Sequence, residues 1–137
     1  RIMLPSLKNM FEVAAARADA LSGDQDIELS VLFQYYEDNK FRTLKGWIAR
    51  YIGEILLNID DAHLSDAEYW IKEAIEASNR DGMRWLLASD YALYAELMKR
   101  KGDKFQTEQN LQKAIEIFKE CGADGWVEKY EQELVKL

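Results

Sequence analysis

The side chains best suited to chemistry gather in one short acidic segment. Asp60, Asp61, His63 and Asp66 place three carboxylates and an imidazole within seven residues, so they could present ligands to a cation. Calcium needs six or more oxygen ligands held by a shaped loop, and the Asp-x-Asp-x-Asp-Gly series of such loops is not found here. We therefore interpret this segment as a solvated loop that caps a helix, and we expect no bound metal.

Catalysis finds equally few candidates elsewhere in the chain. His63 is the only histidine and Cys121 the only cysteine, and they lie far apart in the sequence. No glycine-rich phosphate-binding loop accompanies them. One cysteine allows no internal disulfide, and together with one histidine it provides too few ligands for a zinc site. The sequence thus predicts a protein without enzymatic activity or cofactor, in a reducing, cytoplasmic setting.

Composition favours one soluble helical domain. The 137 residues include one proline and seven glycines, and hydrophobic residues make up 48%, so breakers are too few to interrupt long helices. The formal charge of −7 and the lack of a Lys/Arg cluster oppose binding to nucleic acid. No apolar run reaches the roughly 18 to 20 residues that span a bilayer. Because the chain begins at Arg1 rather than at methionine, we expect it to be a fragment of a larger protein.

Apolar residues that recur at three- and four-residue steps predict an all-α chain of about seven helices. The predicted helices cover residues 5–21, 27–36, 41–59, 65–80, 84–101 and 104–121, with a final helix after Asp124. The second is the least regular, because its β-branched and aromatic residues would also suit a strand.

Short polar side chains mark the predicted starts of three helices. Asp38 or Asn39 is expected to cap the third helix, and Asp124 the last one. Ser65 and Glu68 have the spacing of a capping box, in which each side chain satisfies the backbone amide of the other residue.

Glycines mark the predicted ends of several helices. Gly82 and Gly122, which lie 40 residues apart, are expected to end helices in the left-handed conformation. Gly102 and Asp103 are expected to form a tight turn between two helices.

The helix pairs 40–82 and 83–122 match each other in order. On the first helix of each pair a small residue lies among larger ones, so that Ala49, Ile52, Gly53 and Leu56 correspond to Tyr91, Tyr94, Ala95 and Met98. On the second helix Ala67, Ile71 and Ala74 correspond to Thr107, Leu111 and Ala114. Small residues allow two antiparallel helices to approach closely, and the larger ones fill the gaps between them.

This pattern resembles the tetratricopeptide repeat, and the resemblance covers residues 46–121. It departs from that family in three respects. The spacing from Gly53 to Ala95 is 42 residues rather than about 34, the closing proline is not found, and Thr107 replaces an alanine. The longer variety looks like the repeats of large bacterial signalling proteins.

The resemblance implies tandem antiparallel helix hairpins in a right-handed superhelix. Residues 1–39 would form a degenerate repeat or an amino-terminal cap, 40–82 and 83–122 two repeats, and 123–137 a capping helix, all within a single domain.

In this family the first helix of each repeat lines a concave surface, which implies a set of groove positions beside the packing stripe. They are Trp47, Arg50, Glu54 and Leu57 in one repeat, and Ser89, Ala92, Glu96 and Lys99 in the next. The lysines and asparagines with which some members grip a terminal carboxylate are not found there. The two glutamates would instead attract basic or mixed-charge segments, with Trp47 as an aromatic anchor. Two alternatives stay open: Arg50 and Glu54 pair with each other on a solvated face, and Trp47 is buried beneath the amino-terminal helices.

We therefore expect a protein–protein interaction or scaffold module, the regulatory part of a larger signalling protein, that binds a protein or peptide segment in its groove. The alternative is a homodimer, in which amphipathic terminal helices pair two copies and bring attached effector domains together. An exposed Trp126 or Tyr130 would favour that alternative. A small-molecule or nucleotide pocket between repeats is a third hypothesis, which no residue requires. Trp70, Trp85 and Trp126 are expected to pack between helices.

Overall fold

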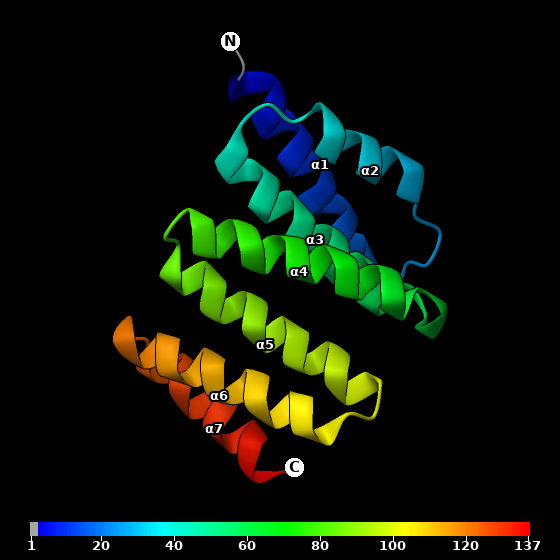
Figure 1. The fold of residues 1–137 in the computed structure, drawn as a ribbon. Helices are drawn as coiled ribbons and strands as arrows, with labels where there is room; N and C mark the ends of the chain where they lie inside the picture. Colours follow the sequence, from blue (N-terminus) through cyan, green and yellow to red (C-terminus); the bar gives the residue numbers. More distant parts are fainter. Residues whose placement is uncertain (1–2) are drawn as a thin grey trace. The chain divides into compact units, whose positions relative to one another are not determined.

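The structure, a computed structural model, describes residues 3–137 and shows an all-α chain over this range. The elements are α1 (Met3–Leu21), α2 (Leu29–Asp38), α3 (Arg42–Ile59), a short 3-10 turn η1 (Asp61–His63), α4 (Leu64–Arg80), α5 (Arg84–Arg100), α6 (Lys104–Glu120) and α7 (Asp124–Val135) (Figure 1). The predicted all-α class is confirmed. The second segment is a helix rather than a strand, and none of the described helices is long and apolar enough to cross a bilayer.

The predicted cap of α3 is wrong. The residue before the helix is Phe41, whose side chain can accept no hydrogen bond. Asn39 is buried instead, where its side-chain amide donates to the carbonyl of Ser6 on α1 at 3.0 Å and its Oδ1 accepts the backbone N–H of Phe41 at 2.9 Å. Asn39 therefore does not cap α3 but joins the α2–α3 connection to α1. This contact exists only because the fold brings α1 next to Asn39.

The predicted caps of α4 and α7 are also wrong, by one or a few residues. Ser65 lies inside the first turn of α4, because η1 runs directly into that helix, and Asp60 is the side chain that accepts a backbone amide, from Ala62. The cap position of α7 is Ala123, and Asp124 is the first residue within the helix. When several polar residues lie close together, the backbone conformation decides which of them is the cap.

The chain forms two compact units, residues 1–77 and 78–137. In the first unit α3 packs against α1 and α2, and Ile48, Ile52 and Leu56 on α3 are fully buried. Gly53 marks a close approach to α4, since a Cβ built on it would meet Cγ1 of Ile71 at 2.7 Å. This contact confirms that a small residue lets these two helices approach.

In the second unit α5 and α6 form an antiparallel hairpin, and α7 packs against α6 (Figure 1). Gly102 follows α5 with a φ of +80°, and the Asp103 side chain then accepts the N–H of Gln106 to start α6. Gly82 and Gly122 also have positive φ, as predicted. These turns place the first helix of the pair directly beside the second.

Helix α7 is amphipathic, as predicted. Val127, Tyr130 and Leu134 are half-buried on the side that faces the hairpin, whereas Glu128 and Gln132 are exposed. The outer face is therefore largely polar, although the side chains of Trp126 and Val135 are also exposed on this helix.

Candidate functional site

Four of the predicted groove residues lie on α3, and the structure divides them between surface and interior. Trp47 and Arg50 are half-buried and keep part of their side chains in contact with solvent. Glu54 and Leu57 are buried, Leu57 with 1% of its surface exposed. Of these four residues, Trp47 and Arg50 are therefore the ones that a partner can touch.

Glu54 is a buried carboxylate held by two arginines. Its Oε2 accepts a hydrogen bond from Nε of Arg17 on α1 at 2.6 Å, and its Oε1 lies 3.5 Å from Nη2 of Arg50, one turn earlier on α3. The Glu54 side chain is 8% exposed, whereas the Arg17 side chain is 33% exposed. The Arg50–Glu54 pair confirms one of the predicted alternatives, but it lies in the interior and not on a solvated face.

Two aromatic rings extend this group along α3. The ring centroids of Trp47 and Tyr51 lie 6.0 Å apart, with the rings tilted by 54°. The guanidinium of Arg17 lies 5.3 Å from the centroid of the Tyr51 ring, a cation–π contact that adds to its ion pair with Glu54. We call Arg17, Trp47, Arg50, Tyr51 and Glu54 the α3 cluster.

Arg17 and Tyr51 were not among the predicted site residues. The groove positions that the resemblance implied did not include Tyr51, and the resemblance covered residues 46–121, which leaves out α1. One signal was available: Arg17 and Lys8 are the only basic residues in α1, and a guanidinium on the packed side of a helix requires a carboxylate partner. The sequence does not say which of the carboxylates provides it.

The other four predicted residues lie on α5, and they divide in the same way. Ser89 and Ala92 are buried, and the hydroxyl of Ser89 donates to the carbonyl of Trp85 at 3.1 Å. Glu96 and Lys99 reach the surface, and the Glu96 carboxylate forms an ion pair with Arg100 at 3.3 Å.

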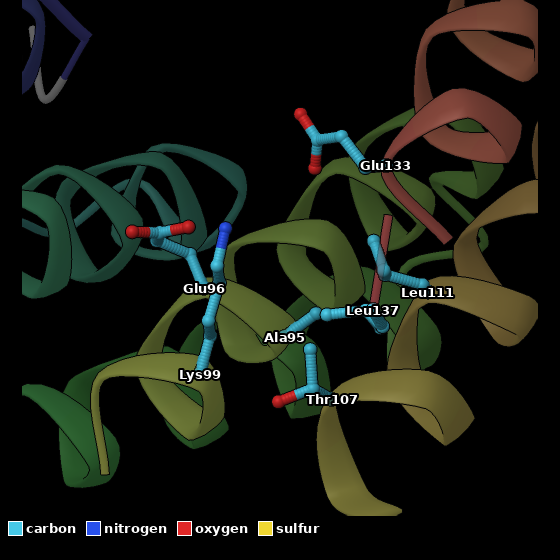
Figure 2. Close-up of a pocket in the computed structure, with 7 residues that line it drawn as sticks. All are labelled: Ala95, Glu96, Lys99, Thr107, Leu111, Glu133 and Leu137. Atoms are coloured by element: carbon cyan, nitrogen blue, oxygen red, sulfur yellow. The ribbon is translucent and has the colours of Figure 1, made fainter. Parts of the chain in front are cut away.

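Glu96 and Lys99 also line a small hollow bounded by all three helices of the second unit (Figure 2). Its walls are formed by Ala95, Thr107, Leu111 and Leu137. Glu133 of α7 also lines it, on a different side from Glu96 and Lys99. The volume of ≈ 10 Å³ accommodates about one water molecule. The hollow is therefore a shallow feature of a surface with mixed charge, and it is too small for a nucleotide or a similar ligand.

The acidic loop uses its polar groups to start α4. Nδ1 of His63 lies 2.7 Å from Oδ1 of Asp60, and this hydrogen bond lowers the pKa of the Asp60 carboxyl below its usual value. The same Oδ1 accepts the backbone N–H of Ala62 at 2.9 Å. The interpretation of this segment as a helix-capping loop is confirmed, with Asp60 as the capping residue.

The tryptophans differ in burial. Trp70 is buried and stacks on Phe33, as expected for a ring between helices. Trp85 and Trp126 lie 6.2 Å apart and both contact Phe118, but they remain 42% and 41% exposed. The predicted packing between helices is thus confirmed for Trp70 and only partly for the other two. An exposed Trp126 was also the observation expected to favour the homodimer alternative.

Comparisons of the chain with protein-family models, with curated proteins and with solved structures find no match. The chemistry of the α3 cluster and of the helix surfaces is therefore the guide to function.

Proposed function

We propose that the chain is a protein–protein interaction module that binds a protein segment through the α3 cluster. The observation that carries this proposal is a half-buried surface on which Trp47 and Tyr51 lie beside Arg17 and Arg50. Trp, Tyr and Arg are the residue types on which binding energy concentrates at protein interfaces. A partner that covers the remaining exposed parts of these side chains would complete their burial.

The buried Glu54 carboxylate supports this role because it orients the guanidinium groups before a partner arrives. Arg17 donates to it at 2.6 Å and Arg50 approaches it at 3.5 Å, so both side chains are restrained in the free protein. Fixing a flexible side chain on binding costs about 0.5–1.5 kcal/mol of entropy, and restraint in advance avoids part of that cost.

Charge defines the class of partner. Two guanidinium groups around one carboxylate leave the α3 cluster with a net positive charge, which favours an acidic side chain opposite it. Residues 1–77 as a whole contain 8 Lys or Arg against 14 Asp or Glu, so the surrounding surface attracts basic residues instead. Together these features favour a mixed-charge segment that also provides an apolar or aromatic side chain for Trp47.

The resemblance to tetratricopeptide repeats extends the proposal. It places the first helices of the repeats, α3 and α5, on the concave side of a right-handed superhelix, and it assigns the chain to the regulatory part of a larger bacterial signalling protein in the cytoplasm. In support, small and large buried residues on α3 and α4 have the spacing of that repeat.

Photo-cross-linking tests the proposal at the level of single residues. A photoreactive phenylalanine analogue replaces Trp47 in one variant and Tyr69 in another, and each is irradiated in lysate of the source cell. Tyr69 is a matched control, because it is an aromatic residue of the same unit that lies on α4 and is 58% exposed. Affinity capture with Trp47→Ala and Tyr69→Ala, both checked for helical content by circular dichroism, accompanies the cross-linking.

We expect position 47 to cross-link to a defined segment of another protein, and we expect Trp47→Ala but not Tyr69→Ala to lose that protein. Equal cross-linking at both positions would mean non-specific contact. Retention of the same protein by Trp47→Ala would refute the proposed role of the α3 cluster.

A further inference from the structure

Helix α1 presents an apolar stripe to solvent. Leu4 and Phe11 are 76% and 62% exposed, and Ala15 and Ala18 are exposed beside them. At 100° per residue these four side chains fall within about 60° of the helix circumference, so they form one continuous line along the axis. Large apolar side chains that gather on one face commonly mark a contact surface.

The buried side of α1 is already occupied. Val13 and Ala20 are buried toward α3, and Arg17 pairs with Glu54 from that side. Leu7 and Met10 are half-buried between the two faces, so α1 is apolar around most of its circumference. A helix with this distribution normally has neighbours on both sides.

Charged residues border the stripe on one flank only, and their order is self-complementary. Lys8 and Asp19 are both exposed and lie at nearly the same angle around the helix, close to the apolar line. They are eleven residues apart, or about 16 Å along the axis at 1.5 Å per residue, so they cannot pair with each other in one helix. In an antiparallel pair of identical helices, by contrast, each Lys8 would lie opposite Asp19 of the other copy.

We propose that the exposed stripe of α1 binds α1 of a second copy of this chain, in antiparallel orientation about a two-fold axis. Charged residues that flank an apolar seam set the orientation of paired helices, and here the Lys8–Asp19 pair forms twice in one orientation. This self-complementary order selects a second copy over an unrelated partner. The proposal is independent of the α3 cluster.

The same register accommodates the apolar side chains. With Lys8 opposite Asp19 of the second copy, Phe11 lies between Ala15 and Ala18 of that copy, and the reciprocal contact forms at the other end. Two alanines leave room for the large ring, so each copy provides both a protruding ring and the space that receives the ring of the other copy. Glu12 lies further around the helix and remains in water.

Sedimentation equilibrium of the full chain tests self-association, and Phe11→Glu tests the surface. We expect the native chain to approach twice its 15.9 kDa mass as concentration rises, and Phe11→Glu to remain monomeric. Phe105→Glu is the matched control, because Phe105 is 65% exposed on α6, and this variant should dimerise like the native chain. A native chain that stays monomeric up to about 1 mM, or a dimer that survives Phe11→Glu, would overturn the proposal.

Charge reversal tests the orientation. Lys8→Glu and Asp19→Lys should each weaken the dimer at least about tenfold, because each places like charges opposite one another twice. An equimolar mixture of the two variants should associate again, since all the opposed pairs are then opposite in sign, and the double variant should dimerise by itself. Failure of both the mixture and the double variant to recover would refute antiparallel pairing through α1.

Discussion

Replacing Gly53 with alanine tests how closely α3 and α4 approach. The added Cβ would lie 2.7 Å from Cγ1 of Ile71 and 3.4 Å from its backbone nitrogen, whereas carbon atoms in contact prefer about 3.5–4.0 Å. Ile71 is fully buried and β-branched, so its side chain has little freedom to rotate away. Relief of the contact therefore requires the two helices to move apart.

Two opposing terms determine the size of the effect. Alanine in place of glycine stabilises a helix interior by about 1 kcal/mol. An extra methyl group forced into a packed core costs about 1–3 kcal/mol, and the fixed backbone behind Ile71 places this case in the upper half of that range. We therefore expect Gly53→Ala to lower the free energy of unfolding by about 1–2 kcal/mol, measured by urea denaturation of the whole chain.

Gly125→Ala is the matched control, because Gly125 lies in α7 and a Cβ there has no atom within 4 Å. It should stabilise the protein slightly, by at most about 0.5–1 kcal/mol. The double variant Gly53→Ala/Ile71→Ala should lose less stability than the sum of the two single changes, since removal of Cγ1 relieves the clash. A stabilising Gly53→Ala, or strictly additive effects in the double variant, would refute the close approach.

Three further changes address single interactions. Glu54→Ala should lower the free energy of unfolding by about 2–3 kcal/mol in urea denaturation, less than for a fully buried pair because the Arg17 side chain is 33% exposed; a loss below about 0.5 kcal/mol would contradict the buried network. Burial, and then the charge of Glu73, raise the pKa of Tyr36 from 10.0 to about 12. Because the phenol has the lower pKa in the unfolded chain, that state loses the proton first. The free energy of unfolding should therefore fall as the pH rises from 10.0 to about 12. Tyr36→Phe should remove that fall, and an unchanged pH profile in this variant would exclude Tyr36 as its origin. Asp103→Ala should lower the free energy of unfolding by about 1 kcal/mol, because it removes the cap that accepts the N–H of Gln106 at 3.0 Å. Asp124→Ala removes no cap hydrogen bond, so it should lower the free energy of unfolding much less, and thermal unfolding of both variants measures the difference.

Helix positions were predictable because they depend on local periodicity and on a few strongly restrictive residues. The 84–101 prediction matches α5 at Arg84–Arg100, and Gly82, Gly102 and Gly122 have the positive φ that their places at helix ends required. The caps were less predictable, as Ser65 and Asp124 illustrate, because several neighbouring residues could perform the same local task.

The candidate site shows the same division. The resemblance to the repeat identified Trp47, Arg50, Glu96 and Lys99, which do reach the surface. It could not distinguish them from Leu57, Ser89 and Ala92, whose burial depends on neighbouring helices.

By itself the sequence determined the order and approximate bounds of the helices, the turns with left-handed glycines and the small residue at Gly53, because each follows from the chemistry of a few consecutive residues. Only the tertiary structure decided that Arg17 meets Glu54, and that the stripe around Phe11 remains exposed. Arg17 and Glu54 are 37 residues apart, and no local pattern specifies which carboxylate a distant guanidinium will meet. Burial of a charge is set by the packing of whole helices, and packing is a property of the folded chain.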